Sequence, residues 1–86
     1  MFIIINYDID EKRCVKVMKL CRKYLHHLQE SVFVGELTDQ QYRSLREALN
    51  KIIVPKEDCV IVYQMPSIKT FKVETLGSQY WIRTVI

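Results

Sequence analysis

Two uniformly apolar runs flank two stretches with helical spacing in this chain of 86 residues. Residues 2–5 are apolar at every position, which is typical of a strand that is buried on both faces inside a sheet. Residues 59–63 repeat this pattern and predict another central strand, which Pro66 ends. Residues 70–75 alternate apolar and polar side chains, so we expect an outer strand with one wet face.

Apolar residues at spacings of three and four predict two amphipathic helices. Asp10 can cap the first helix, and adjacent His26 and His27 are expected to end it as surface residues. Its apolar stripe comprises Cys14, Val17, Met18, Cys21, Tyr24, Leu25 and Leu28. The second helix follows a capping box of Thr38 and Gln41. Its buried face comprises Tyr42, Leu45, Ala48, Leu49 and Ile52.

The segment 28–37 reads as extended structure, either one bent strand or two short ones, and Gly35 is a candidate for a bulge or bend. Gly77 is expected to turn the chain, after which residues 81–86 could form a last short strand. Nothing inside one small protomer covers that aromatic and apolar tail. We therefore expect Trp81, Ile82 and Val85 to dock on a second protomer or on another protein.

This order of elements predicts the α+β class, as a ferredoxin-like βαββαβ sandwich with an added C-terminal strand. The ferredoxin-like domain would span residues 1–77, and residues 78–86 would form the tail. Both helices would cover one face of an antiparallel sheet. The other face would stay open for a partner, most simply a second copy in a homodimer.

The composition, 49% hydrophobic and 27% charged with two glycines and two prolines, excludes a disordered or low-complexity chain. No apolar run approaches the roughly 20 residues that span a bilayer, and no signal peptide precedes the first strand. We therefore expect a cytoplasmic protein. The three cysteines form no C-x-x-C pair, so buried thiols are favoured over a zinc site.

Positive charge is concentrated on the first predicted helix, where residues 11–28 hold six basic side chains against one acidic side chain. Lys12, Lys16, Lys19 and Lys23 follow the helical repeat and form a basic ridge. Such a ridge suits a partner that carries phosphate, although a plain solvated helix face has the same pattern.

Asp8 is the candidate for catalytic chemistry, because the chain has no nucleophile elbow, P-loop, H-E-x-x-H or G-x-G-x-x-G motif. Alone, Asp8 could be a metal ligand, a helix cap or a loop residue, and Asp10 is the better cap. Mg²⁺ often binds through one or two protein carboxylates together with substrate phosphate. In a two-fold dimer, two copies of Asp8 could meet and complete such a site.

Several of these features occur together in one known family. They are Tyr7-Asp8-Ile9, the pair Lys12-Arg13, Gln29-x-Ser31-Val32-Phe33-x-Gly35, Leu37-Thr38 and the late strand from Asp58 to Tyr63. Over residues 1–77 the chain resembles the small CRISPR-associated adaptation protein, the "Cas two" family.

The resemblance implies a ferredoxin-like homodimer that acts in the acquisition of CRISPR spacers, between copies of the CRISPR integrase. It implies binding of double-stranded DNA, the spacer precursor, and also a metal-dependent endoribonuclease activity on single-stranded RNA, or a DNase activity in some members. Asp8 then stands at the position of the catalytic metal ligand, with Mg²⁺ as the expected ion.

The resemblance also suggests nucleic-acid contacts at Lys12 and Arg13, and we add Lys16 and Lys19 of the same ridge. We also expect nucleic-acid contacts at Ser31 and Phe33, which fall in the family's Q-x-S-V-F segment, and at His27 shortly before it. Phe33 also suits a core or a dimer interface. The sequence departs from the family at His27 and Cys14, where basic residues are common. Without the resemblance, a ferredoxin-like regulatory or ligand-binding dimer that does not bind nucleic acid remains the alternative.

Overall fold

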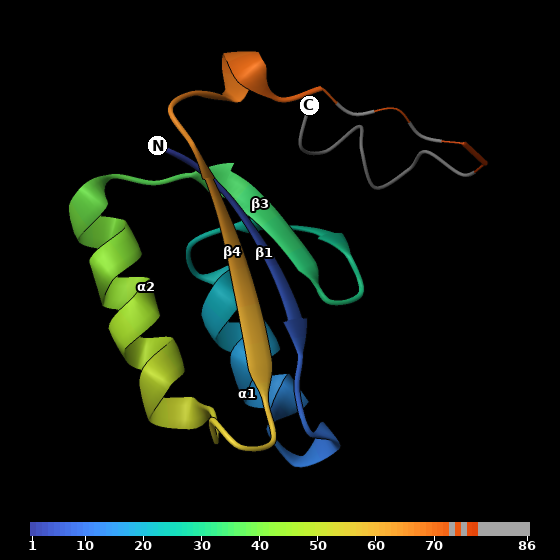
Figure 1. Cartoon of the computed structure of the whole chain (residues 1–86), viewed down its shortest axis with the longest axis vertical. Helices are drawn as coiled ribbons and strands as arrows, with labels where there is room; N and C mark the ends of the chain where they lie inside the picture. Colours follow the sequence, from blue (N-terminus) through green and yellow to red (C-terminus); the bar gives the residue numbers. More distant parts are fainter. Residues whose placement is uncertain (73, 75, 78–86) are drawn as a thin grey trace.

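The computed structural model describes residues 1–72, 74, 76 and 77, and within them it shows one antiparallel sheet with two helices (Figure 1). The strands are β1 (Phe2–Asp8), β2 (His26–Gln29), β3 (Val32–Glu36) and β4 (Cys59–Met65); the helices are α1 (Glu11–Arg22), α2 (Asp39–Ile52) and the short 3₁₀ helix η1 (Ile68–Thr70). The strand order is β2-β3-β1-β4. This arrangement confirms the predicted ferredoxin-like α+β fold.

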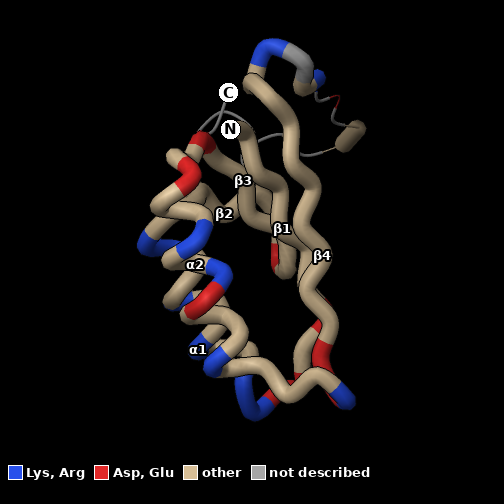
Figure 2. The backbone as a smooth tube through the Cα atoms, turned by 60° about the vertical axis from the view of Figure 1, so that its left-hand side comes forward, with Lys and Arg blue, Asp and Glu red and all other residues tan. Residues whose placement is uncertain are grey.

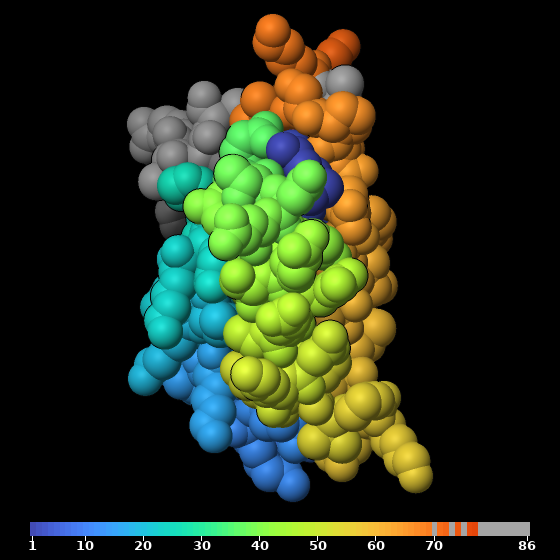
Figure 3. Space-filling model, turned by 90° about the vertical axis from the view of Figure 1, so that its left-hand side faces the viewer, coloured from blue at the N-terminus to red at the C-terminus, as the bar shows by residue number. Residues whose placement is uncertain are grey.

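The two helices form one layer against a single face of the sheet, as a turned view shows (Figure 2). Side chains from both layers meet in one core, which includes Ile3, Ile5, Tyr7, Val17, Cys21, Phe33, Leu45 and Leu49. Seen from the helix layer, α2 covers the middle of the surface between α1 and β4 (Figure 3). Among the described residues, no helix is long and apolar enough to cross a membrane.

The central position of β1 is confirmed, because it pairs with β3 on one side and with β4 on the other. The prediction for β4 is wrong within the described part of the protomer, where this strand pairs with β1 alone and lies at the sheet edge. The apolar pattern of β4 therefore does not mean that both of its faces are buried within the protomer. Val60 and Val62 pack against the core, whereas Ile61 and Tyr63 are 44% and 52% exposed on the opposite face.

Helix α1 begins at the predicted cap but ends at Arg22, earlier than its apolar stripe indicates. His26 and His27 open β2 instead of closing the helix, and Leu28 belongs to that strand. Strand pairing outweighs the helical spacing here. The backbone N–H groups of Lys23 and Tyr24 form tight i→i−3 bonds to Leu20 and Cys21, and His26 and His27 then pair with β3.

Residues 28–37 form parts of two strands, joined by a turn at residues 30–31. The irregular register falls between His27 and Gln29, not at Gly35 as we had considered. Gly35 lies opposite Ile3 within β3, where an added Cβ would stand 3.0 Å from Cδ2 of Leu25. The glycine therefore permits a close approach between β3 and the segment after α1.

Strand β4 ends before Pro66 as predicted, but the next segment is not the expected outer strand in its described residues. Helix η1 occupies its start, and the ring of Phe71 packs on Phe2 with centroids 4.8 Å apart. Gly77 adopts a φ of 92°, which suits the predicted turn. The tail 78–86, with Trp81, Ile82 and Val85, lies outside the described residues.

Candidate metal and nucleic-acid site

Asp8 ends β1 on the face of the sheet that the helices leave uncovered. Tyr7 points into the core, so Asp8 and Asn6 lie on the opposite face. In the ladder, Asp8 lies opposite Cys59, the first residue of β4. The Asp8 carboxylate is exposed and has no hydrogen bond or ion pair within the described residues. It is therefore available to a ligand from solvent.

Asp10 is the N-cap of α1, as the sequence predicts. Its side chain accepts a hydrogen bond of 3.0 Å from the backbone N–H of Lys12. This bond satisfies one of the free donors of the first helical turn. The roles of the two neighbouring carboxylates thus separate, since Asp10 serves the helix and Asp8 does not.

Asp58 is the residue of this region that the sequence analysis missed as a functional candidate. Its side chain is fully buried, and its carboxylate accepts four hydrogen bonds. Two come from Arg13, from Nε at 2.7 Å and from Nη2 at 2.9 Å. The backbone N–H groups of Asp10 and Val54 donate the others, at 2.8 and 2.7 Å. Its signals in the sequence were its place directly before an apolar strand and its membership of the late strand that contributes to the family resemblance.

The bidentate contact between Arg13 and Asp58 shifts the pKa of both groups. The two hydrogen bonds from Arg13 hold the pKa of the Asp58 carboxyl well below its usual range, against the opposing effect of burial. The same bonds raise the pKa of Arg13. Nη2 of Arg13 also lies 3.2 Å from Glu57. The structure thus directs Arg13, a predicted nucleic-acid contact, toward its own protomer.

The lysines of the predicted ridge are exposed, three of them on α1 and Lys23 directly after it. Lys12, Lys16 and Lys19 have no ion pair within the described residues, so their charges face solvent. Acidic and basic residues occur together at the end of the molecule where the β1–α1 and α2–β4 connections lie (Figure 2). The ridge therefore keeps the property that binding to phosphate requires.

The Q-x-S-V-F segment contributes Ser31 and Phe33, and His27 lies two residues before it. Phe33 is fully buried, and its ring therefore offers no surface to a nucleobase. His27 stacks on Phe33 with centroids 4.4 Å apart, and Nε2 of His27 lies 2.8 Å from the carbonyl of Glu30. The hydroxyl of Ser31 donates to the side-chain oxygen of Asn6 at 3.3 Å. Ser31 thus reaches the face that carries Asp8, whereas Phe33 belongs to the core.

A divalent metal would find one free carboxylate here, that of Asp8. Within the described residues, no three His, Cys, Asp or Glu side chains form a cluster that could hold an ion. One carboxylate with water and substrate phosphate is nevertheless a known way to bind Mg²⁺. The donor set therefore fits a hard cation that is completed from outside the protomer.

The cysteines differ from one another in exposure. Cys21 is buried as predicted, and burial raises the pKa of its thiol to about 12. Cys14 is partly buried, and its thiol donates to the carbonyl of Ile9 at 3.1 Å. The prediction is wrong for Cys59, which is exposed because the edge strand places it on the uncovered face.

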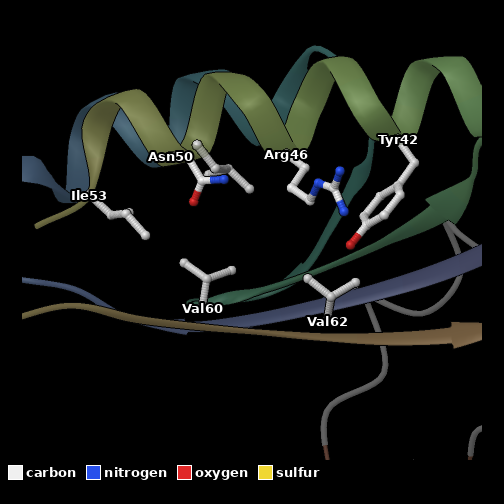
Figure 4. Close-up of a pocket in the computed structure, with 7 residues that line it drawn as sticks. Tyr42, Arg46, Asn50, Ile53, Val60 and Val62 are labelled. Carbon is white, nitrogen blue, oxygen red and sulfur yellow. The ribbon is translucent and has the colours of Figure 1, made fainter. Parts of the chain in front are cut away.

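A hollow of about 210 Å³ lies between α2 and β4 (Figure 4). Its floor includes Val60 and Val62, and Arg46 and Tyr42 extend over it from α2. The guanidinium carbon of Arg46 lies 5.9 Å from the centroid of the Tyr42 ring. No carboxylate or thiol lines this hollow, so it is separate from the candidate site at Asp8.

Comparisons with known sequences give a consistent family. The model of one family, described as CRISPR associated protein Cas2, matches residues 1–73. The CRISPR-associated endoribonuclease Cas2 of Thermotoga maritima is 46% identical over 77 residues, which cover 90% of this chain and 88% of that protein. The protein of the same name from Pyrococcus furiosus is 40% identical over 77 residues, with the same coverage.

Solved structures agree with the sequence comparisons. A crystal structure of Cas2 matches with a TM-score of 0.85 and 35% identity, covering 93% of this chain and 90% of that one. A crystal structure of Streptococcus pyogenes Cas2 at pH 6.5 matches with a TM-score of 0.80 and 31% identity, covering 90% of this chain and all of that one.

Proposed function

Because the chain belongs to the Cas2 family of CRISPR-associated proteins, we propose that it acts in CRISPR adaptation, the acquisition of new spacers. In this role it is a cytoplasmic homodimer that binds the double-stranded spacer precursor and scaffolds the CRISPR integrase. The tail residues Trp81, Ile82 and Val85 dock the integrase. Phosphodiester cleavage at Asp8 is a second, accompanying activity.

The observation that carries the DNA-binding role is the exposed ridge of Lys12, Lys16 and Lys19. Lysine ammonium groups without internal partners bind phosphates and release counterions, whatever the base sequence. Such contacts suit a protein that must hold spacer precursors of many sequences. This charge pattern favours nucleic acid over the alternative of a regulatory dimer that binds none.

The uncovered sheet face supports the homodimer. Ile61 and Tyr63 are large exposed apolar side chains on that face, and Ile4 lies opposite Tyr63 in the ladder. An apolar patch of this kind usually marks an interface. If two copies pack through it about a two-fold axis, their Asp8 side chains lie in the same interface.

Reconstituted spacer integration tests the adaptation role. The assay combines the integrase, a double-stranded precursor and CRISPR array DNA with wild-type protein, Asp8→Asn, or a chain that ends at Gly77. A scaffold predicts that Asp8→Asn retains integration and that the shortened chain loses it. Loss with Asp8→Asn alone would instead assign a catalytic role in integration. Equal integration without the protein would contradict the adaptation role.

The cleavage activity follows from the free carboxylate of Asp8 and from the names of the relatives, which are endoribonucleases. Asp8 would hold a divalent metal, for which we propose Mg²⁺, with a phosphate of the bound strand. When bound, such an ion activates water or stabilises the leaving oxygen. The chain contributes the carboxylate at the strand end, and the lysine ridge retains the strand beside it.

Cleavage of a labelled single-stranded RNA, with duplex DNA in parallel, tests the second activity. Wild-type protein should cut one of them in Mg²⁺ and not in EDTA, and Asp8→Asn should abolish the cut. Asp39→Asn is the matched control, because this exposed aspartate lies at the start of α2 and outside the site. If Asp8→Asn cleaves as fast as wild type, the activity belongs to a contaminating nuclease.

A further inference from the structure

We propose that Asp58 and Arg13 act as a clamp that positions Asp8, an inference that rests on the proposed metal-dependent cleavage at Asp8. The clamp consists of the Asp58 carboxylate and its four donors: the two nitrogens of Arg13 and the backbone N–H groups of Asp10 and Val54. Neither Asp58 nor Arg13 touches the substrate in this proposal. Both are positioning residues.

The clamp joins two segments that are distant in the sequence, residues 10–13 and residues 54–58. Asp10 follows β1, Arg13 lies in the first turn of α1, and Val54 follows α2. Asp58 itself is the residue before β4. A single carboxylate thus fixes the connection that follows Asp8 against the connection that leads into β4. Because every acceptor site on Asp58 is used, the carboxylate does not compete with Asp8 for a cation.

The backbone at Asp8 is fixed both by strand pairing and by the contacts of the residues that follow it. On the sheet side it pairs with Cys59, the residue that directly follows Asp58. On the helix side, Ile9 is 8% exposed in the core and its carbonyl accepts from the thiol of Cys14. The backbone N–H of Asp10 then donates to the carboxylate of Asp58. An exposed side chain therefore projects from a backbone that the clamp fixes, as a metal ligand needs.

The charges of the clamp also suit a cation site. Arg13 is positive and directed at the buried Asp58 carboxylate, so its charge is neutralised within the protomer. Loss of the Asp58 carboxylate would leave the Arg13 guanidinium, which lies next to the connection after Asp8, with only its outer ion pair to Glu57 within the described residues. The less compensated positive charge would repel a divalent cation, and the backbone N–H of Asp10 would lose its acceptor.

The test compares Asp58→Asn and Arg13→Lys with wild type and two controls. Asn keeps the shape of the side chain but lacks the negative charge, and Lys keeps the charge but cannot form the bidentate contact. Glu57→Gln is the matched control, since it removes only the outer ion pair with Arg13. Leu49→Ala, in the core on α2, controls for a general loss of stability.

Two measurements are made at a temperature where every variant is folded by circular dichroism. Electron paramagnetic resonance follows Mn²⁺ binding to the protein alone, and RNA cleavage gives kcat and KM. Substitution of residues that orient metal ligands typically lowers metal affinity by roughly 10-fold to 100-fold. We expect that loss in Asp58→Asn, with a lower kcat and little change in KM because the lysine ridge is intact. Arg13→Lys should lie between wild type and Asp58→Asn.

Each outcome has a separate meaning. Glu57→Gln and Leu49→Ala should keep wild-type Mn²⁺ affinity if the clamp is responsible. If wild type binds Mn²⁺ through Asp8 and Asp58→Asn binds it equally well, the clamp is overturned and the proposed function stands. Equal losses in Asp58→Asn and Leu49→Ala would also overturn it, because stability alone would then explain both. If wild type neither binds Mn²⁺ nor cleaves RNA, the proposed metal site fails, and the clamp as its positioning device fails with it.

Discussion

Asp58 couples the stability of the fold to pH through a single buried carboxylate. Its pKa is held well below its usual range by hydrogen bonds from Arg13 and from two backbone N–H groups. The folded chain therefore binds this proton less readily than the unfolded chain, in which an aspartate titrates near about 3.9. The stabilisation is complete above that value and decreases as the pH falls below it.

We predict that Asp58→Asn makes the free energy of unfolding less dependent on pH in the acid range. Urea denaturation at a series of pH values between about 2 and 6 measures this slope. The variant should be less stable than wild type at neutral pH, and the difference should narrow toward the acid end. Asp8→Asn is the control, since its carboxylate is exposed and lies outside the clamp. Parallel curves for wild type and Asp58→Asn would contradict the prediction.

The three thiols should differ widely in reactivity because they differ in exposure. Cys59 is exposed, Cys14 is partly buried, and burial raises the pKa of Cys21 to about 12. Only thiolate attacks a disulfide reagent, so Cys21 should react only when the chain unfolds. From protomers whose uncovered sheet face is free, we expect one fast phase with dithionitrobenzoate at pH 8, and Cys59→Ser should remove it. Fast labelling of Cys21 in the native protein would contradict the structure.

For single residues, the sequence was sufficient to predict a contact where the partner is close along the chain. Asp10 is a cap because Lys12, two residues later, supplies its donor. Asp58 and Arg13 are 45 residues apart, and nothing local to either residue indicates the pair. The exposure of Cys59 likewise depends on the position of β4 at the sheet edge. Long-range pairing, rather than residue type, decides these cases.

Helix α1 is the element for which the structure leaves a predicted surface intact. Its exposed lysines face solvent, and each phosphate that a lysine contacts steepens the dependence of affinity on salt by about 0.9 for duplex DNA. We predict that the triple change of Lys12, Lys16 and Lys19 to Gln lowers the affinity for duplex DNA and reduces the magnitude of that slope by up to roughly 3.

Fluorescence anisotropy with a labelled duplex between low and moderate salt measures both quantities. The matched control changes Lys51, Lys56 and Lys69 to Gln, which removes the same charge from exposed positions outside α1. A general effect of net charge would weaken both triple variants equally. That outcome, or an unchanged slope in the α1 variant, would contradict the ridge as the DNA-binding surface.

Element boundaries show which local signals are reliable in this chain. The capping box of Thr38 and Gln41 is present in the structure with both of its hydrogen bonds, because its atoms lie within one turn. The end of α1 has no glycine or proline, and apolar spacing continued to residue 28 in the sequence. Pairing of His26 with Val34 decides that boundary, and this contact is not encoded within the helix itself.

At the scale of the whole molecule, the order of elements was enough to predict the fold, because each apolar pattern had one compatible partner layer. The position of β4 was not predictable in the same way. A strand that is apolar on both faces indicates burial on both faces, but it does not say which protomer provides the second cover. The exposed side chains of β4 indicate a cover from outside the protomer only once the helices are known to lie on the other face of the sheet (Figure 2).

The uncovered face of the sheet leads to the prediction for the assembly. Ile61 and Tyr63 lie on this face, opposite Asn6 and Ile4 of β1, and they are 44% and 52% exposed. Burial of apolar surface drives most protein association, and a stable dimer covers about 800 Å² on each partner. A carboxylate at each of these two positions would instead have to be buried without a partner.

We therefore predict that the double variant Ile61→Glu and Tyr63→Glu is a folded monomer under conditions in which wild type is a dimer. Sedimentation velocity gives the mass, and circular dichroism confirms the fold. Ile68→Glu is the control, because Ile68 is 40% exposed on η1 and lies outside the sheet. The double variant should also lose metal-dependent cleavage if a second copy completes the site at Asp8. A monomeric wild type, or a dimer that survives both substitutions, would show that this face is not the interface.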